Sequence, residues 1–420
     1  MGKISKRRLL SLVVLSAVAV AFFTLHFSQA QVTGSLDLSV PPLQIINSAG
    51  YAVYQHKYFS GAYYAAWKSS PLGGSLGPNN FSIGDVDNDG SREIAAVVNY
   101  ATREERIKGK TVTYFNQKIV AFENGNYSGG LPNWESPPLG ESTSVVNCNT
   151  AIADVDNDGD FEFALLKGRH IEVYDLTGGG FSLVKKWDDY PYPIFSIDAG
   201  DADNDGENEI VLSIFYVGAP IIWKYDNASG NWSSKTAEPI PPEDYGAGFD
   251  MLGLDYARVR DADNAIDEYN KKDNEIVGGG NNDRLMVWKY NKDTQAYDLK
   301  FVSADLGGFT QGVDAGDING DGQNEVVVGS CRTGQGRKRT PGNLCIFAFN
   351  GASYVMVNSF GLEFDLGDLG LGDLDNDGRA EIAFSAVPPP SLRIYDFIGQ
   401  VGAGNIQLAY GGEGYGLEIR

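Results

Sequence analysis

Histidine and cysteine are scarce in this chain of 420 residues, which contains three of each. Proteins build zinc sites mainly from these two side chains. His26 lies in an apolar N-terminal stretch, and neither His56 nor His170 has a second histidine at zinc-ligand spacing or a nucleophile motif nearby. The shortage therefore argues against a zinc enzyme and against a hydrolase that uses a nucleophile–histidine pair.

Positive charge is also limited, because 33 lysines and arginines stand against 55 aspartates and glutamates, for a formal net charge of −22. Proteins that bind nucleic acid need a basic surface for the phosphates, so this composition excludes nucleic acid as a partner. Phosphate-binding loops, nucleophile elbows and metalloprotease helix motifs are missing from the sequence as well.

What the chain has in abundance is a nine-residue motif, acid–x–acid or Asn–x–Asp–Gly–x–x–Glu, which occurs five times. We name the copies loop 1 (85–93), loop 2 (154–162), loop 3 (201–209), loop 5 (317–325) and loop 6 (373–381). Gly at position 6 of every copy suits a bend with positive φ. Apolar, β-branched runs flank the copies, so each copy is predicted to be the turn of a β-hairpin. The side chains at positions 1, 3, 5 and 9 are Asp85, Asp87, Asp89, Glu93, Asp154, Asp156, Asp158, Glu162, Asp201, Asp203, Asp205, Glu209, Asp317, Asn319, Asp321, Glu325, Asp373, Asp375, Asp377 and Glu381.

These crowded oxygens predict a cation in each loop, because the acidic side chains otherwise repel one another. Ca²⁺ takes about six to eight oxygen ligands, whereas Mg²⁺ requires a stricter octahedron and fits the loops less well. The helical EF-hand shares the first six positions, but its Glu stands at position 12 and its flanks are helices. A turn without metal is the alternative, since Asp, Asn and Gly are common turn residues. Repetition with constant spacing favours about five Ca²⁺ sites.

A sixth copy, loop 4 (261–275), is degenerate. It begins with Asp261 and Asp263, but Ala stands at position 5, the Gly is missing and the final Glu comes six residues late. Asp267 or Glu268 from the inserted residues are alternative ligands. We expect a hairpin that has kept its shape and lost its ion.

The loops begin at residues 85, 154, 201, 261, 317 and 373, so the unit repeats every 47–69 residues. Each unit has apolar runs for about four short strands and Gly-rich turns, which is typical of β-propeller blades. Rungs of a β-solenoid have a much shorter period. Strand-like runs at 51–54, 63–67 and 414–420 lie outside the six units, and together they predict a seventh blade closed by both chain ends. Six blades with extra terminal strands are the alternative.

The units resemble FG-GAP/VCBS repeats, which build the propellers of integrin α-chains and of many secreted microbial proteins. The resemblance covers about residues 50–420 and rests on the repeated Asp-x-Asp-x-Asp-Gly core. It implies that positions 1, 3, 5 and 9 ligate Ca²⁺ through side chains and position 7 through its carbonyl oxygen. The resemblance does not identify any residue of a ligand-binding surface in this chain. The residues at position 7 are Ser91, Asp160, Glu207, Gln323 and Arg379.

Residues 1–30 have the pattern of an export signal, with a basic start, an apolar run and small residues before Gln31. Cleavage before Gln31 is favoured. An uncleaved membrane anchor is the alternative, because the apolar run is nearly long enough to span a bilayer. We expect residues 31–48 to be a short lead-in segment, residues 49–420 to form one propeller domain, and the protein to be secreted or displayed at the cell surface.

Two of the three cysteines, Cys331 and Cys345, flank one connecting loop in the fifth unit. In an exported protein this arrangement predicts a disulfide between them, with two unpaired strand cysteines as the alternative. Cys148 has no obvious partner and is expected to be a buried small apolar residue.

Taken together, these features predict an exported, calcium-binding β-propeller that acts as a recognition or adhesion module. Its partner would be an extracellular protein or a carbohydrate, bound by loops between blades, while the metals hold the hairpins and take no part in a reaction. One alternative is a carbohydrate-active enzyme, a lyase or hydrolase of extracellular polysaccharide. Another is a structural component of the cell surface. No residue is assigned a catalytic role.

Overall fold

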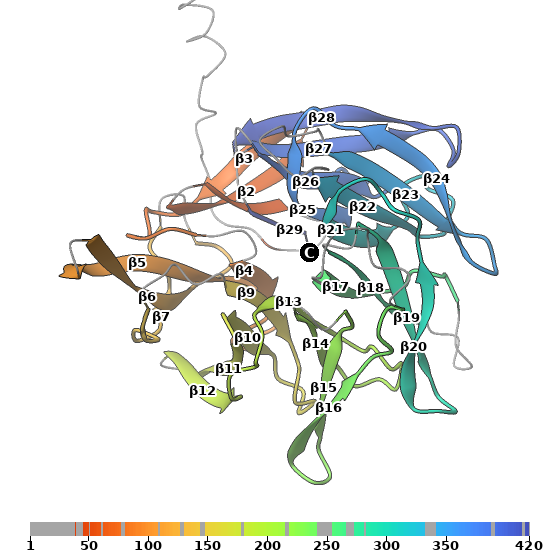
Figure 1. Ribbon diagram of the computed structural model, residues 1–420. Helices are drawn as coiled ribbons and strands as arrows, with labels where there is room; N and C mark the ends of the chain where they lie inside the picture. Colours follow the sequence, from red (N-terminus) through yellow and green to blue (C-terminus); the bar gives the residue numbers. More distant parts are fainter. Residues whose placement is uncertain are drawn as a thin grey trace, which may run out of the picture.

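The computed structural model is an all-β ring of antiparallel sheets (Figure 1). Within the described residues, no helix is long and apolar enough to cross a membrane. The structure describes residues 38, 45–49, 51–59, 62–76, 80–107, 110–126, 130–142, 148–177, 180–214, 218–241, 254–265, 273–280, 283–331, 342–387, 391–413 and 416–419.

Each loop joins the first and second strands of one sheet, and we number the blades by the loop that they contain. Blades 1 and 2 comprise β4 (Phe81–Gly84), β5 (Glu93–Ile107), β6 (Lys110–Phe122), β7 (Trp134–Glu135) and β8 (Glu141–Ser142), then β9 (Cys148–Ala153), β10 (Glu162–Lys167), β11 (His170–Thr177) and β12 (Gly180–Lys186). Blades 3 and 4 comprise β13 (Ile194–Gly200), β14 (Glu209–Ile214), β15 (Ile221–Asp226) and β16 (Asn231–Thr236), then β17 (Leu254–Arg260), β18 (Glu275–Gly280), β19 (Leu285–Asn291) and β20 (Ala296–Val302). Blades 5 and 6 comprise β21 (Phe309–Gly316), β22 (Glu325–Cys331), β23 (Asn343–Phe349) and β24 (Tyr354–Gly361), then β25 (Asp365–Gly372), β26 (Glu381–Val387), β27 (Ser391–Ile398) and β28 (Asn405–Glu413).

The seventh blade combines both ends of the described chain. It contains β1 (Ile45–Ala49), β2 (Ala52–Phe59), β3 (Ala62–Lys68) and β29 (Gly416–Ile419) in the order β29-β1-β2-β3. The predicted seven-bladed propeller, closed by strands from the N- and C-terminal parts of the chain, is thus confirmed. One detail differs, because β1 begins at Ile45, within the expected lead-in segment 31–48, and contributes a strand to the ring.

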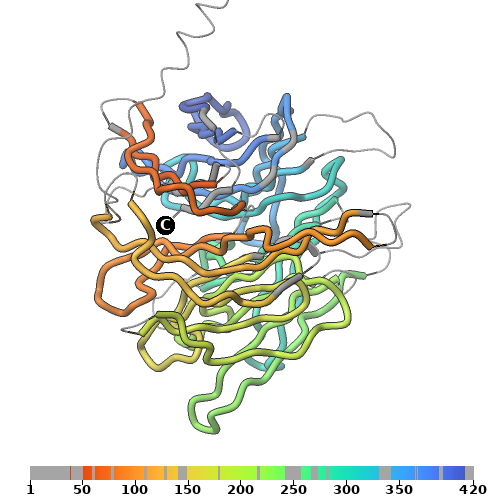
Figure 2. Tube along the Cα trace, turned by 90° about the vertical axis from the view of Figure 1, so that its left-hand side faces the viewer, coloured from red at the N-terminus to blue at the C-terminus, as the bar shows by residue number. Residues whose placement is uncertain are grey.

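The first strands of neighbouring blades meet around the centre of the ring, where β13, β17, β21 and β25 contact one another in sequence (Figure 1). In blade 1 the hairpin of β5 and β6 is longer than the strands around it, and residues 101–107 of β5 are exposed. Figure 2 shows this orange hairpin reaching to one side of the ring.

The second strand of a blade is buried on both faces because it lies between two neighbouring blades. In β14, Ile210 and Leu212 belong to the same core as Leu166 of blade 2, whereas Val211 belongs to the core that contains Ile276 of blade 4. A strand in this position needs apolar side chains on both faces, which explains the continuous apolar runs after the loops. Each fully buried aliphatic side chain contributes about 1.5–3 kcal/mol relative to an exposed one.

The structure does not contain the predicted disulfide. Cys345 is a buried free thiol, and its Sγ lies 3.7 Å from the hydroxyl oxygen of Ser359. In the ladder between β22 and β23, Cys345 stands opposite Val328, three residues along the strand from Cys331. Three strand residues span about 10 Å, and a disulfide joins Cα atoms less than about 7 Å apart. The register of the hairpin therefore separates the two cysteines.

Some predictions concern parts of the chain outside the described residues. These are the export segment 1–30 and the inserted residues Asp267 and Glu268 of loop 4. The side chain of Cys148 is likewise outside the description.

Candidate metal centres

The loops share one backbone form, which the residues at positions 4 and 6 allow. Gly at position 6 has a φ between 84° and 102° in loops 1, 2, 3, 5 and 6, as predicted. Position 4 is also left-handed, with a φ of 58–64° where it is Asn and 78° at Gly320 of loop 5. Asn and Gly adopt this conformation at the lowest cost. The asparagines at position 4 are Asn88, Asn157, Asn204, Asn264 and Asn376.

The Asp at position 1 organises each turn. In loop 1, Oδ1 of Asp85 accepts a hydrogen bond of 3.0 Å from the amide of Asp89, and its Oδ2 accepts one of 2.9 Å from the amide of Gly90. Asp154, Asp201, Asp317 and Asp373 repeat both bonds in their own loops. Backbone donors thus hold these carboxylates within the turn.

The Asp at position 5 accepts a hydrogen bond from the backbone amide of position 7. In loop 1, the amide of Ser91 lies 2.7 Å from Oδ1 of Asp89. The same bond is made by the amides of Asp160, Glu207, Gln323 and Arg379. Position 7 is therefore tied into the turn through its backbone, whatever its side chain.

The Glu at the end of each loop is buried and presents one carboxylate oxygen to the loop. In loop 1, Glu93 is fully buried and its Oε2 accepts a hydrogen bond of 3.0 Å from the amide of Val86. The amide at position 2 makes this bond in the other loops too, with Glu162, Glu209, Glu275, Glu325 and Glu381 as acceptors. Burial raises the pKa of Glu93, Glu162, Glu209 and Glu381 to about 8.

In four loops the structure brings predicted ligands together. One carboxylate oxygen from each residue lies within 4.8 Å of the others in each group. The groups are Asp85, Asp87 and Glu93 in loop 1; Asp154, Asp156 and Glu162 in loop 2; Asp201, Asp203 and Glu209 in loop 3; and Asp373, Asp375, Asp377 and Glu381 in loop 6. Four of the oxygens, Oδ1 of Asp87, Oε1 of Glu93, Oδ1 of Asp156 and Oε1 of Glu209, are buried with no hydrogen-bond partner in the described chain, although Oε1 of Glu209 lies 2.8 Å from the ammonium nitrogen of Lys224 as an ion pair. Ca²⁺ binds such oxygens, so the residues present fit this ion.

Loop 5 differs because its position 3 is an amide. Nδ2 of Asn319 lies 3.2 Å from Oδ2 of Asp321 and 3.1 Å from Oε1 of Glu325. The amide therefore lies among the predicted ligands and lowers the negative charge of this loop compared with the others.

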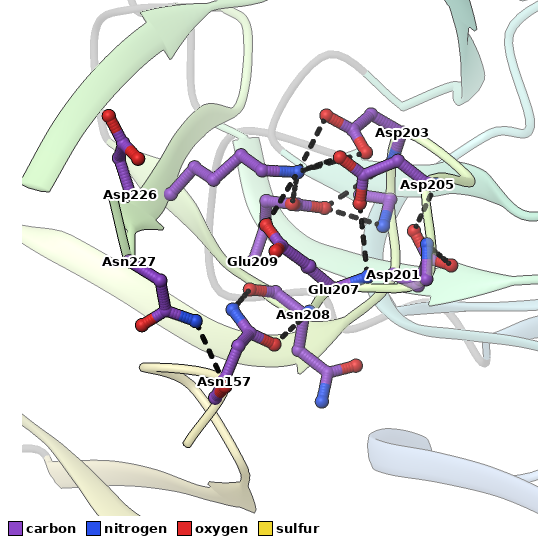
Figure 3. Close-up of polar contacts among 12 residues, drawn as sticks. Asn157, Asp201, Asp203, Asp205, Glu207, Asn208, Glu209, Asp226 and Asn227 are labelled. Carbon is purple, nitrogen blue, oxygen red and sulfur yellow. Dashed lines mark hydrogen bonds and ion pairs between the residues drawn. The ribbon is translucent and has the colours of Figure 1, made fainter. Parts of the chain in front are cut away.

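In loop 3 the acidic side chains surround a lysine. Nζ of Lys224, from β15, lies 3.1 Å from Oδ2 of Asp203, 2.5 Å from Oδ2 of Asp205 and 2.8 Å from Oε1 of Glu209. Figure 3 labels Asp203, Asp205 and Glu209, and its dashed lines mark the ion pairs that these carboxylates make with the lysine, which is drawn without a label. Burial disfavours the charge of Lys224, but the hydrogen bonds to Asp205 and Glu209 raise its pKa above the usual range.

Loop 4 has a lysine in the same place. Nζ of Lys289, from β19, lies 2.6 Å from Oδ2 of Asp263, 3.0 Å from Oδ2 of Asp273 and 2.7 Å from Oε1 of Glu275. Loop 4 keeps the hairpin form although its motif is degenerate. Both lysines stand in a Trp-Lys-Tyr run of a third strand. This shared tripeptide is the signal in the sequence that could have identified them.

Neighbouring loops are joined by paired asparagines, a second feature that the motif did not predict. The amide of Asn208 lies 2.8 Å from Oδ1 of Asn157, and Nδ2 of Asn208 lies 3.0 Å from the carbonyl oxygen of Asp154 (Figure 3 labels both asparagines). Asn204 with Asn274, and Asn264 with Asn324, connect the next loops in the same way. Bonds from Phe161 to Asn88 and from Ala380 to Asp317 complete the series from loop 1 to loop 6.

The fold and these loops define the class of protein, a seven-bladed β-propeller with an acidic turn in six blades. No family model matches the chain, and no curated protein matches it. Solved structures do match in fold. A candidate 6-phosphogluconolactonase of Bacteroides fragilis superposes with a TM-score of 0.54 at 8% sequence identity, over 90% of this chain and 98% of the other.

Two further structures cover the same shares of each chain. They are the periplasmic gluconolactonase of Pseudomonas aeruginosa, with a TM-score of 0.50 at 13% identity, and a protein of unknown function from Desulfotomaculum acetoxidans, with a TM-score of 0.50 at 11% identity. At these identities the similarity establishes the propeller fold and nothing about the chemistry.

Proposed function

We propose that this chain is an exported, calcium-binding β-propeller that acts outside the cell or at its surface as a recognition or adhesion module. The observation that carries the proposal is the convergence of acidic oxygens in four loops, together with the buried Glu93 oxygen that has no donor in the described residues. The resemblance of the repeated loop to FG-GAP/VCBS repeats and the export-type pattern of residues 1–30 support it.

The role of the ion in this proposal is structural. Bound Ca²⁺ would supply positive charge to carboxylates that the fold has buried, and in loop 6 its ligands would be Asp373, Asp375, Asp377 and Glu381. The backbone amides hold the turns, and the paired asparagines connect one loop to the next. Extracellular Ca²⁺ at millimolar concentration suits sites of low affinity.

The partner that we propose is an extracellular protein or a carbohydrate. Aromatic rings that stack on sugars or fill protein contacts need to be accessible, and Tyr51 and Tyr192 are exposed at 62% and 42%. The net charge of −22 favours a neutral or cationic partner.

Calcium dependence is tested by calorimetry of the purified full-length chain with 2 mM Ca²⁺ or with EDTA. An ion that binds only the folded state stabilises it by mass action, about 2.7 kcal/mol for each site at a hundredfold excess over Kd. We expect EDTA to lower the melting temperature and Mg²⁺ to restore it only partly. A melting temperature that is the same in Ca²⁺ and in EDTA would overturn the structural role. A glycan array and a screen of extracellular proteins then test the recognition role.

A second candidate function is that of a carbohydrate-active hydrolase. Two of the structures with this fold are named as gluconolactonases. On the innermost strands, buried Asp198 and Asp314 form ion pairs with Arg260, and Asp368 forms one with Arg258. Incubation with gluconolactone and with acidic polysaccharides tests which of the two functions is correct. Release of a hydrolysis product would favour an enzyme over a binding module.

A further inference from the structure

The residue that faces the loop glutamate from the third strand differs in charge from blade to blade. Glu209 pairs with Lys224, and Glu325 pairs with Ala348. In the other blades the ladder pairing ends one residue before the glutamate, and continuing the register by one step gives the residue at the same facing position. The facing residues of loops 1 to 6 are Glu123, Asp175, Lys224, Lys289, Ala348 and Asp396.

In loops 3 and 4 the facing lysine already supplies a cation. An ammonium group has three N–H donors, and three carboxylates surround each of these lysines, at 2.5–3.1 Å from Lys224 and 2.6–3.0 Å from Lys289. Ca²⁺ requires the same oxygens at about 2.3–2.6 Å. The ammonium and the ion therefore exclude each other from these loops.

Loop 4 indicates that a lysine, without a metal ion, is sufficient to maintain the backbone conformation that the loops share. Its ligand at position 5 is replaced by Ala265. Nevertheless, Asn264 keeps a φ of 58°, and Oε2 of Glu275 accepts a hydrogen bond of 2.9 Å from the amide of Ala262. These are the features of the intact loops, and in loop 4 the ammonium of Lys289 supplies the compensating charge.

In loop 1 the facing residue adds a carboxylate. One oxygen of Glu123 lies within 4.8 Å of oxygens of Asp87 and Asp89. Oε1 of Glu93, which is fully buried, has no hydrogen-bond donor among the described residues, whereas the corresponding oxygen of Glu209 contacts the ammonium of Lys224. The same oxygen thus has a cation in loop 3 and none in loop 1.

The facing acids of loops 2 and 6 occupy the same place in the ladder as Glu123 in loop 1. Asp175 follows Tyr174, which pairs with Phe163, and so faces Glu162. Asp396 follows Tyr395, which pairs with Ile382, and so faces Glu381. Both facing acids therefore add negative charge to a loop that already contains clustered carboxylates.

We propose that the facing residue decides which loops take a divalent cation. In loops 1, 2 and 6 an acid from the third strand adds a ligand outside the nine-residue motif, and in loops 3 and 4 a lysine replaces the ion. Loop 5, which faces Ala348, relies on its own ligands. The inference rests on the proposed calcium binding and changes the expected number of ions from five to four.

The test is the number of Ca²⁺ ions bound, measured by native mass spectrometry and by equilibrium dialysis of the full-length chain. The wild type should bind four. Lys224→Asp, which gives loop 3 the facing residue of loops 2 and 6, should bind five, and Glu123→Lys should bind three. Lys300→Asp and Glu104→Lys make the same charge changes at exposed strand positions and should both stay at four.

The outcomes separate this inference from the proposed function. A wild type that binds no Ca²⁺ would overturn the proposed function itself. A wild type that binds five ions, together with a Lys224→Asp variant that also binds five, would overturn only the role of the facing residue. If Lys224→Asp does not fold, anomalous scattering from Tb³⁺ in wild-type crystals decides the question. Tb³⁺ is expected in loops 1, 2, 5 and 6, and Tb³⁺ in loop 3 would contradict the inference.

Discussion

Oε2 of Glu93 accepts a hydrogen bond of 3.0 Å from the backbone amide of Val86, and this bond fixes the direction of the other carboxylate oxygen. That second oxygen is buried and finds no donor in the part of the chain that the structure describes. A charged oxygen in this state weakens the fold unless a cation neutralises it. The hydrogen bond between Val86 and Glu93 therefore leaves loop 1 with a buried carboxylate oxygen that a bound cation would neutralise.

The variant Glu93→Gln should change stability in opposite directions with and without calcium. In EDTA at pH 7 we expect it to be more stable than the wild type by about 1–3 kcal/mol, because the wild type must protonate Glu93, whose pKa burial raises to about 8, in order to bury it without a cation. In saturating Ca²⁺ it should be less stable by about 2–3 kcal/mol, because one site is lost. Urea unfolding under both conditions measures the difference, with the exposed Glu104→Gln as control. Equal destabilisation under both conditions would exclude a cation at Glu93.

The paired asparagines should contribute to stability with or without calcium. Asn157→Gly removes the acceptor of the Asn208 amide and should cost about 1–2 kcal/mol. Asn157→Ala should cost about 1 kcal/mol more, because Asn157 has a φ of 58°. Urea unfolding measures both variants. Asn231→Ala is the control, since among the described residues its side chain bonds only to Ser229 of the same turn. Wild-type stability of both Asn157 variants would show that the loops are independent.

Acid should weaken blade 2 through Glu172, which is not one of the predicted metal ligands. Burial opposes its ionisation, but hydrogen bonds from His170, Tyr174 and Lys186 lower its pKa to about 2. A carboxylate whose pKa is lower in the folded state stabilises the fold above its unfolded pKa, near 4.5. This contribution, on the order of 2–3 kcal/mol, is lost as the pH falls from about 4.5 to about 2.

The stability of Glu172→Gln relative to the wild type measures this effect. The variant should be less stable at pH 7, and the gap should close between pH 4.5 and pH 2. Both proteins are measured in EDTA, so that titration of the loops cancels in the difference. A gap that stays constant with pH would exclude the lowered pKa.

The thiol of Cys345 should be unreactive in the folded protein. It is buried on β23, and burial raises the pKa of the thiol, so little thiolate is present at neutral pH. Iodoacetamide followed by peptide mass spectrometry should modify Cys345 slowly in buffer and rapidly in denaturant. Recovery of Cys331 and Cys345 as a disulfide-linked peptide under non-reducing conditions would contradict the register described above.

The sequence predicted the architecture well because the repeat is explicit. Each acidic loop marks the turn between the first two strands of a blade, and the apolar runs after it mark the buried strands. The closing blade was also predictable, since strand-like runs at 51–54, 63–67 and 414–420 lacked partners. β1 was missed because Ile45–Ala49 (Ile-Ile-Asn-Ser-Ala) lacks a strong strand pattern and precedes the first aromatic run.

The candidate site was predictable only within the nine-residue motif. Asp203 and Glu209 belong to the motif, but Lys224 lies on the next strand, and only the register of β14 with β15 places it among them. The asparagine pairs likewise depend on the distance between blades, which no local pattern contains. The predicted disulfide was wrong for the same reason. The positions of Cys331 and Cys345 relative to each other depend on the strand register, which the spacing in the sequence does not specify.

The pairing of β29 with β1 means that the ring closes only after residues 416–419 have been synthesised. During synthesis, residues 45–68 emerge long before residues 416–419, so the molecule remains an open arc while blades 1 to 6 are made. Until β29 arrives, β1 has an unprotected edge that can pair with another polypeptide. A prematurely terminated product would keep that edge and would be a candidate for aggregation or proteolytic removal.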